Sequence, residues 1–486
     1  MSFEKTSAEI LARLAELRAA DAPTHGGRVL SYVYDSGLAE LDELAAQAVR
    51  AVQPVNGLDP TTFTSVATLE RELLGFVRDL VHGDSEVVGT VTTGGTESCL
   101  LAVKTARDLW TGTGRPRLVA PTTVHAAFQK AAHYFGLDLD LVPVGADGVV
   151  TVDAVAARLG DDVALVVASA PSYPFAALDP IEALAALCAG RGIPLHVDAC
   201  IGGLVLPFWP DVPTWDFAVA GVMSLSADLH KFGYAPKGVS VLLQRGRDRQ
   251  RAQYFATTRW PGYPVVNPTI LGSKSAGPLA AAWAISEALG TAGFAELAAS
   301  CVRSTIALRA AIDGIEGLRV VGEPVGPLLA VAADGDVAAE NRVDPHHWAD
   351  AARRSGWVLQ LQPGLTQSDG TVLPATTHLT ITPVTEAGLP ELVPALVAAA
   401  DAVRGVPHVD PTPLLAELPP LEGGLDSETA WALLQGFGIG PSTGSATGSS
   451  LPDQLAPLLA LIEVLPATIA ERLLTELLAR MVEPRR

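Results

Sequence analysis

Residues 87–121 of the chain read VVGTVTTGGTESCLLAVKTARDLWTGTGRPRLVAP. A β-branched run (87–93) leads through a glycine pair into a helical stretch (97–110), and a second β-branched run follows at 117–121. The same alternation continues through the helical stretches 125–136 and 181–192 and the apolar runs 164–171, 194–200, 217–225 and 238–245. Strands that alternate with helices predict an α/β fold whose mostly parallel sheet is covered on both faces.

The pattern changes after residue 290, where long alanine-rich helices are interrupted by a few short strand-like runs, RVVGEP (319–324), GWVLQLQ (356–362) and HLTITPV (378–384). This change predicts a second, smaller α+β domain. We therefore divide the chain into an N-terminal helical arm (1–55), a large domain (56–290) and a C-terminal small domain with terminal helices (291–486).

The charge composition of the chain argues against two classes of partner. The chain has 486 residues and a net charge of −20, from 33 Lys and Arg against 53 Asp and Glu. Such a surface repels phosphate backbones and anionic lipid, so nucleic acid and membranes are poor candidates as partners. Because no apolar run resembles a signal or a membrane span, we expect a soluble cytoplasmic protein. The cysteines lack the paired spacing of a zinc site and are expected to be reduced thiols.

Polar clusters stand at the ends of three predicted strands, where open α/β sheets bind ligands. TTGGTES (92–98) joins a strand to a helix, and its amide groups, with Gly94 and Gly95 allowing close approach, could hold a phosphate. A glycine turn that only caps the helix is an equally good interpretation. Asp198 closes a second strand, and such a carboxylate could bind a metal, cap a helix or pair with a cationic ring.

Lys231 lies 33 residues beyond Asp198, after the next apolar run. A lysine at this place could form an imine with an aldehyde cofactor if burial lowers the pKa of its amine. A phosphate cradle, a carboxylate and a lysine on successive strand ends together suit pyridoxal 5′-phosphate, which needs its phosphate held, its ring nitrogen protonated and its aldehyde tethered.

Histidines and a cysteine near these clusters have simpler interpretations. His125 could stack on a cofactor ring, or it could make a local hydrogen bond at a helix start. Cys200, beside Asp198, is more typical of a small buried residue than of a reactive thiol. His346 and His347 are adjacent and point apart on any helix, so we expect solvated side chains and no metal site.

Taken together, seven motifs resemble the PLP-dependent group II decarboxylase superfamily and, within it, the sphingosine-1-phosphate lyases. They are TTGGTES (92–98), HAAFQKAAHYFG (125–136), ASAPSYPFAALDPIEAL (168–184), IPLHVDACIGGLVLPF (193–208), SLSADLHKFGYAPKGVSVLL (224–243), YFATTRWPGYPVVNPTILGSKSAG (254–277) and, more weakly, LIEVLPATIAERLLTELL (461–478). The resemblance implies the aspartate-aminotransferase fold (fold type I), with a sheet of the seven-stranded type.

The resemblance also implies roles for individual residues. Lys231 would carry the cofactor as a Schiff base, Asp198 would face its pyridine nitrogen and His125 would stack on its ring. His230, Gly95 and Thr96 would lie near its phosphate. Ser273 matches a phosphate contact that the family supplies from the partner subunit, which implies a homodimer with shared active sites.

Three positions that bear on the substrate in the lyases are present as Tyr34, Tyr173 and Lys237. The chain departs from the lyases at NGLDP (56–60), because the lyases have proline and histidine where this chain has Gly57 and Asp59. A carboxylate at position 59 would repel a phosphorylated substrate unless a cation such as Arg259, where the lyases usually have an acid, offsets it. The two exchanges together indicate a changed substrate specificity.

The resemblance implies a PLP-dependent carbon–carbon lyase that splits an amino alcohol, phosphorylated or not, into an aldehyde and an amine. Tyr173 or an oxygen of the substrate's phosphate could take the hydroxyl proton. An amino-acid decarboxylase on the same scaffold is the alternative, and a PLP-binding protein without turnover is a third interpretation. The intact set of Lys231, Asp198 and His125 argues against the third.

Overall fold

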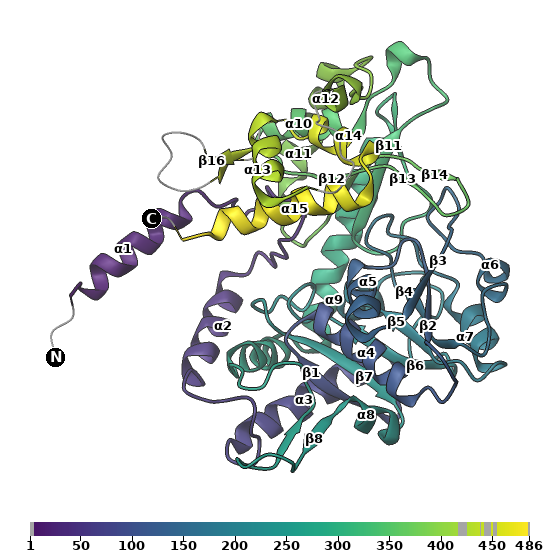
Figure 1. The fold of residues 1–486 in the computed structure, drawn as a ribbon. Coiled ribbons are helices and arrows are strands. Elements are labelled where there is room, and N and C mark those ends of the chain that lie inside the picture. Colours follow the sequence, from purple (N-terminus) through teal and green to yellow (C-terminus); the bar gives the residue numbers. More distant parts are fainter. Residues whose placement is uncertain (1–3, 417–424, 438, 442–448, 451–453, 485–486) are drawn as a thin grey trace.

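The computed structural model describes residues 4–416, 425–437, 439–441, 449–450 and 454–484. Its larger part is built on a seven-stranded sheet with the strand order β1-β7-β6-β5-β4-β2-β3 (Figure 1). Only β7 runs against its neighbours, so the prediction of a mostly parallel sheet is confirmed. The strands are β1 (Val87–Thr92), β2 (Arg117–Pro121), β3 (Asp138–Val142), β4 (Val163–Ser169), β5 (Leu195–Asp198), β6 (Val222–Ala227) and β7 (Ser240–Arg245).

Helices cover both faces of this sheet. One face carries α4 (Gly95–Leu109), α5 (Ala126–Phe135) and α8 (Arg247–Gln253), while α3 (Thr64–Leu80), α6 (Val152–Ala156) and α7 (Ile181–Ala189) belong to the other. Successive residues of β2 show why both faces are apolar: Leu118 and Ala120 join the core cluster under α4 and α5, whereas Val119 joins the cluster on the opposite face. A sheet buried on both sides explains the nearly unbroken apolar strands of the sequence.

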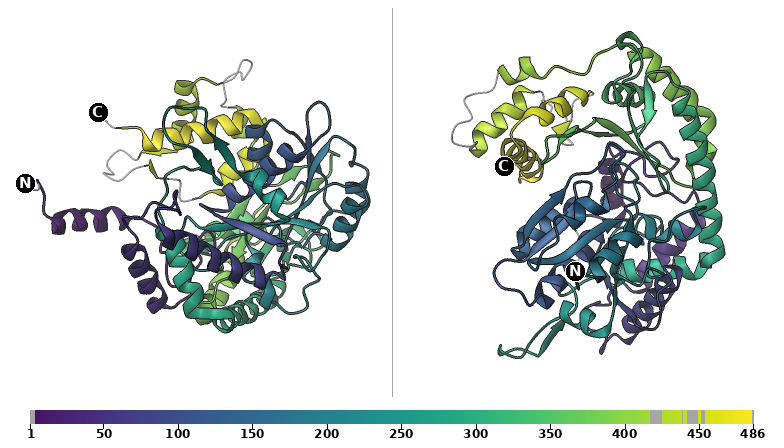
Figure 2. Two further views of the ribbon diagram at one scale, coloured as in Figure 1. Left: turned by 90° about the horizontal axis from the view of Figure 1, so that it is seen from below. Right: turned by 90° about the vertical axis from the view of Figure 1, so that its right-hand side faces the viewer.

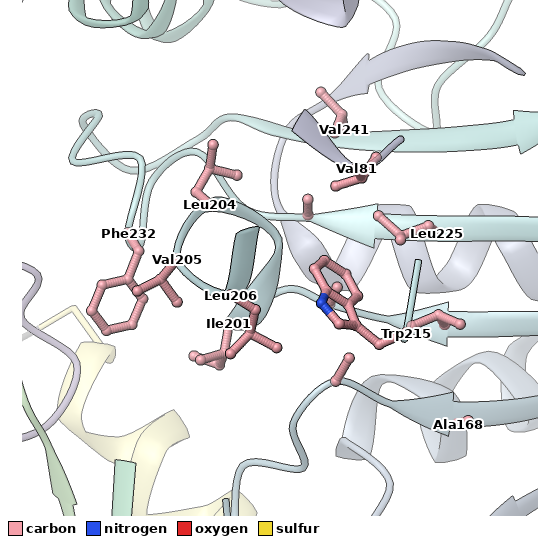
Figure 3. Packing of buried hydrophobic residues seen from close by; sticks show 14 of the residues in the cluster. Val81, Ala168, Ile201, Leu204, Val205, Leu206, Trp215, Leu225, Phe232 and Val241 are labelled. Carbon is pink, nitrogen blue, oxygen red and sulfur yellow. The ribbon is translucent and has the colours of Figure 1, made fainter. Parts of the chain in front are cut away.

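The larger core cluster fills the space beside the strand ends. Trp215 lies among side chains of the turns η1 (Gly202–Leu204) and η2 (Leu206–Phe208), close to Leu225 of β6 (Figure 3). Phe232 is also fully buried in this cluster. Because Phe232 follows Lys231 directly, its burial fixes the backbone that presents the lysine.

A second, antiparallel sheet with the order β10-β11-β15-β12 forms the smaller part. The long helix α9 (Gly277–Asp313) connects the two parts, and Gly290 interrupts it with a φ of 53°. The segment Val29–Leu30 adds to this second sheet through hydrogen bonds to Val358 and Thr380. The domain boundary at residue 290 stays a prediction. The strands are β10 (Leu318–Val320), β11 (Leu328–Ala333), β12 (Gln360–Gln362) and β15 (Thr376–Thr380).

The N-terminal helix buries no residue and extends away from the rest of the chain (Figure 2, left). In the part of the chain that the structure describes, no helix is long and apolar enough to cross a bilayer. The remaining helices are α1 (Ser7–Arg18), α2 (Ala39–Ala51), α10 (Pro345–Arg354), α11 (Thr385–Val403), α12 (Thr412–Ala416), α13 (Ser427–Gly436), α14 (Ala456–Val464), α15 (Ala467–Val482) and the turn η3 (Ala339–Asn341). Short hairpins pair β8 (Phe255–Thr257) with β9 (Val265–Asn267), β13 (Leu365–Thr366) with β14 (Val372–Leu373), and β16 (Gly440–Pro441) with β17 (Ser449–Ser450).

The expectation that both adjacent histidines are solvated is wrong for His346, whose side chain is completely buried. His347 is partly exposed. The two rings do point apart, as helical spacing requires, but the side that His346 faces is the protein interior.

Candidate active site

The predicted site residues follow strands that end at one edge of the large sheet. β7 runs antiparallel to both β1 and β6, so β1 and β6 are parallel to each other and to β5 and β4. Their carboxyl ends therefore lie along the same edge. This arrangement brings Gly95, Asp198, Tyr173 and Lys231 to one side of the molecule.

Lys231 makes an ion pair that the sequence did not predict. Its Nζ lies 2.9 Å from Oδ2 of Asp228, in a turn directly after β6. Burial lowers the pKa of Lys231, but the charge and hydrogen bond of Asp228, with smaller contributions from Tyr34 and Cys200, together raise it well above the usual value. The pKa of Asp228 is correspondingly lowered, because Lys231, His230 and the hydroxyl of Ser240 offset its burial. The sequence made imine formation conditional on a lowered pKa of Lys231, and in this arrangement the pKa is raised instead.

Gly95 packs directly on this ion pair. A Cβ at this position would lie 2.6 Å from both carboxylate oxygens of Asp228 and 2.8 Å from Sγ of Cys200. Gly95 also begins α4, whose first amides have no partner within the helix and point out of its end. The close approach of the Gly95 backbone to the carboxylate of Asp228 explains why this residue is a glycine. A turn that only caps the helix would not require a glycine here.

Glu97, in the first turn of α4, connects the two loops that border this helix end. Its Oε2 accepts hydrogen bonds from the backbone and side chain of Thr93, at 2.6 and 2.9 Å. Its Oε1 accepts from the amides of Ile270 and Leu271, at 2.8 and 3.3 Å. The loop that leads to Ser273 is thereby tied to the predicted phosphate cradle.

Asp198 is buried at the end of β5 and accepts hydrogen bonds from the amide of Cys200 (3.1 Å) and the hydroxyl of Ser226 (3.3 Å). A ligand atom of Asp198, Cys99 and Cys200 lies within 4.8 Å of each of the others. A hydrogen bond with Cys99, burial and the nearby carboxylates raise the pKa of Cys200 well above its usual value. Burial also raises the pKa of Cys99, so both thiols keep their protons at neutral pH and are poor metal ligands.

Tyr34 and Lys237 lie together beside the lysine. The Nζ of Lys237 lies 4.5 Å from the centre of the Tyr34 ring and donates a hydrogen bond to the carbonyl of His230 at 2.7 Å. Burial raises the pKa of Tyr34 to about 12. Burial and the positive charge of Lys231 lower the pKa of Lys237 to about 8. Lys237 is thus able to lose a proton near neutral pH.

Tyr173 reaches the same region from the loop after β4. Its ring stacks on that of His378 with centroids 4.2 Å apart, and its hydroxyl is buried with no hydrogen-bond partner among the described residues. Burial, with smaller contributions from neighbouring tyrosines, raises the pKa of Tyr173 far above its usual value. A buried hydroxyl without a partner favours a bound group in front of it.

Other predicted site residues are held by local contacts. The Nδ1 of His125 accepts from the amide of Ala127 at 3.2 Å, which is the simpler of the two roles considered for it. The Nε2 of His230 lies 3.5 Å from Oδ2 of Asp228. Thr96 and Ser273 are exposed, and Ser273 accepts a hydrogen bond of 3.4 Å from Asn56.

Asp59 takes part in a tight turn. Its Oδ1 accepts from the amide of Thr61 at 3.0 Å and its Oδ2 from the hydroxyl of Thr62 at 2.8 Å. The hydroxyls and amides of these two threonines lower the pKa of Asp59 to about 2. Arg259 is exposed, and no ion pair joins it to Asp59 among the described residues. The role of Asp59 toward substrate stays a prediction.

The sequence did not single out two of these residues, Asp228 and Glu97. Asp228 lies three positions before Lys231, and this spacing, together with the apolar residue between Asp228 and His230, was the signal available. Glu97 could be recognised only as an acidic residue in the first helical turn, because its partners in the second loop lie 173 and 174 residues away.

The donor set as a whole fits PLP: a helix end for a phosphate, a lysine for an aldehyde and a buried carboxylate for a ring nitrogen.

Comparison with known proteins agrees with this fit. The model of the "Pyridoxal-dependent decarboxylase conserved domain" matches residues 40–330, and that of the "Pyridoxal-dependent enzyme, C-terminal putative HTH domain" matches residues 387–480. The sphingosine-1-phosphate lyase of Dictyostelium discoideum is 37% identical over 320 residues, which are 64% of this chain and 60% of that protein's length. A probable L-tyrosine/L-aspartate decarboxylase of Methanocella arvoryzae is 31% identical, over 70% of this chain and 88% of its own.

Among solved structures, that of the sphingosine-1-phosphate lyase Bpss2021 from Burkholderia pseudomallei is similar with a TM-score of 0.75 and 31% identity. The match covers 83% of this chain and 91% of that one. The predicted fold type I architecture is therefore confirmed.

Replacing Gly95 by alanine should weaken the binding of PLP. The added Cβ must displace Asp228 or Cys200, and overpacking of this kind typically costs about 1–3 kcal/mol. We expect at least a tenfold weaker retention of PLP, measured from its absorbance after dialysis. Gly75→Ala on α3 is the control, because its Cβ would meet no atom within 4 Å. Equal retention by the Gly95→Ala and wild-type proteins, both folded by circular dichroism, would contradict the packing argument.

Proposed function

Because the chain belongs to the pyridoxal-dependent decarboxylase family, we propose that it is a carbon–carbon lyase that splits an amino alcohol into an aldehyde and an amine. Its cofactor is pyridoxal 5′-phosphate. The observation that carries the proposal is the similarity to sphingosine-1-phosphate lyases both in sequence and in structure. The aligned region covers less than two thirds of the Dictyostelium lyase, so we propose the reaction class and not that protein's substrate.

The bound cofactor supplies an aldehyde that joins an amine and a ring that accepts the electron pair of the breaking bond. In the proposed site, Lys231 would hold the aldehyde of the cofactor. Asp198 holds a proton at the ring nitrogen and so keeps the ring able to accept electrons. The amides of Gly95 and Thr96, with His230 and the partner-derived Ser273, hold the phosphate.

Cleavage of an amino alcohol also needs a group that takes the hydroxyl proton. Tyr173 keeps its own proton at neutral pH because its pKa is strongly raised, which supports a role as hydrogen-bond donor to the substrate. Lys237 has a pKa of about 8 and lies against Tyr34. Of the three substrate-facing residues proposed, Lys237 is the one that can accept a proton near neutral pH.

A decarboxylase is the second candidate, favoured by the similarity to the Methanocella protein, whose name describes a decarboxylase. Both reactions use the same cofactor and tether. They differ in the bond that is held perpendicular to the cofactor ring, and so in whether the substrate loses an aldehyde or carbon dioxide.

Product analysis distinguishes the two reactions. The holoenzyme should be incubated with a panel of amino alcohols and amino acids, and the products identified by mass spectrometry. We expect aldehyde and amine, in equal amounts, from at least one amino alcohol. Lys231→Ala is the control and should lose at least about a thousandfold in rate, because the tether and its proton are lost together. Carbon dioxide release without aldehyde would establish the decarboxylase instead.

We also propose that the active form is a homodimer in which each site receives Ser273 from the partner subunit. The exposure of Ser273 supports this arrangement. Mixing inactive Lys231→Ala with inactive Ser273→Ala protein should restore part of the activity, because a hybrid dimer contains one intact site. Lys231→Ala mixed with itself is the control. Full activity of a monomer, isolated by size-exclusion chromatography, would refute the shared site.

Finally, we propose that Asp59 disfavours a substrate that ends in a phosphate. Its low pKa keeps it anionic at neutral pH. Asp59→Asn removes the charge but retains an oxygen for the turn, and Asp59→His adds a donor. We expect both to raise the ratio of kcat/KM for a phosphorylated amino alcohol to that for its unphosphorylated counterpart, by about tenfold or more. A wild-type enzyme that already prefers the phosphorylated member, with an unchanged ratio in both variants, would show that Asp59 does not contact the substrate.

A further inference from the structure

A second cluster of charged and imidazole groups lies far from the candidate active site along the chain, where the C-terminal helices meet the smaller sheet. Asp344 caps α10, His346 stands in the first turn of that helix, His408 lies between α11 and α12, and Glu463 belongs to α14. The rings of His346 and His408 have centroids 5.7 Å apart. Asp344 and His346 are buried, whereas the His408 side chain remains 38% exposed and gives the cluster access to solvent.

Asp344 divides its two carboxylate oxygens between different tasks. Oδ1 accepts the amide hydrogens of His346 and His347, at 3.0 and 2.9 Å, and so caps the helix. Oδ2 is turned toward the ring of His408, 2.7 Å from its Nδ1. One oxygen therefore remains for a ligand without loss of the helix cap.

The hydrogen bonds of His346 determine which of its nitrogens has a free lone pair. Nε2 lies 2.8 Å from the carbonyl oxygen of Gln362, and a carbonyl only accepts, so Nε2 carries the hydrogen. Nδ1 is then an acceptor, and it is buried with no partner among the described residues. A fully buried imidazole nitrogen without a donor is costly in an apolar interior, and a cation is one way to satisfy it.

His408 is positioned by a second carboxylate. Its Nε2 lies 3.0 Å from Oε2 of Glu463, and Oε1 of Glu463 accepts the amide hydrogen of Gly364 at 2.8 Å. Metal-binding histidines usually donate their second ring hydrogen to a carboxylate or a carbonyl. His408 with Glu463, and His346 with the carbonyl of Gln362, both follow this rule.

We propose that Asp344, His346 and His408 bind a divalent transition-metal ion of the zinc class, with water as a fourth ligand and Glu463 orienting His408. One ligand atom from each of the three residues lies within 4.8 Å of the other two. Tetrahedral bonds of about 2.0–2.2 Å require ligand atoms about 3.3–3.6 Å apart. Asp344 and His408, now 2.7 Å apart, must therefore separate by somewhat less than about 1 Å to admit the ion. Two imidazoles and one carboxylate favour zinc over calcium or magnesium, which prefer oxygen ligands.

The ion would join α10 of the smaller part to α14 of the C-terminal helices, because the residues around it come from both. Its role is structural in this proposal, since no residue of the cluster belongs to the candidate active site. A proton is the competing occupant: the two carboxylates raise the pKa of His408 to about 10, so the cluster is held by an imidazolium when no metal is bound.

The test uses the full-length holoenzyme, first treated with a chelator and then given zinc. After gel filtration, elemental analysis should find one zinc per chain, and titration calorimetry should give the affinity. His346→Gln retains a donor toward Gln362 but replaces the imidazole nitrogen by a neutral amide oxygen, which is a poor zinc ligand, so we expect it to lose bound zinc. Glu463→Gln should weaken binding by about 10- to 100-fold without abolishing it, as changes to a residue that orients a ligand commonly do.

His347→Gln is the matched control, since it is the adjacent histidine and its side chain lies outside the cluster. We expect it to bind zinc like the wild type, and zinc to raise the melting temperature of both. No retained zinc in the wild type would overturn the proposal and leave the imidazolium as the occupant. Retention by His346→Gln equal to that of wild type would also overturn it, because the ion would then lie elsewhere.

Discussion

The ion pair between Lys231 and Asp228 constrains the site more than any other contact. It lies after β6, with the Asp228 side chain almost fully buried, and a buried pair of this kind is stable only when its remaining hydrogen-bonding capacity is satisfied. Ser240, at the start of β7, donates to Oδ1 of Asp228 at 2.6 Å. Gly95 closes the other side, where no Cβ fits. Three strands of the sheet, β1, β6 and β7, must therefore keep their register for the lysine to be presented.

The order of the strands follows from the same requirement. β7 runs against its two neighbours, so the chain can leave β6, form the turn that holds Asp228 and Lys231, and return alongside β6 at once. β1 then lies on the far side of β7 with its carboxyl end at the same edge as that of β6. A fully parallel sheet would need a long crossover after β6 and could not place Ser240 against Asp228.

The sequence predicted the large sheet well because its strands are buried on both faces and stand out as apolar runs. The run 117–121 coincides with β2, whereas β3 was missed because its aspartates and leucines alternate at the edge of the sheet. Asp228 was missed for a different reason. Its pairing with Lys231 depends on the geometry of the turn between them, and Asp198 already supplied a carboxylate. His346 was misjudged because the spacing of two adjacent histidines on a helix does not tell which of them faces the interior, where His346 meets His408 from another segment.

Asp228 also explains why two lysines six residues apart have opposite pKa shifts. Both are partly removed from water, which by itself disfavours the charged form of each. Of the two amines, the carboxylate contacts only that of Lys231, so the positive charge is stabilised there, and that charge adds to burial in disfavouring a second charge on Lys237. The result is one amine held in its charged form and one that is close to losing its proton. Lys231 must become neutral before it can react with an aldehyde, so its ion pair with Asp228 has to weaken first, whereas Lys237, with a pKa of about 8, can lose its proton without such a change.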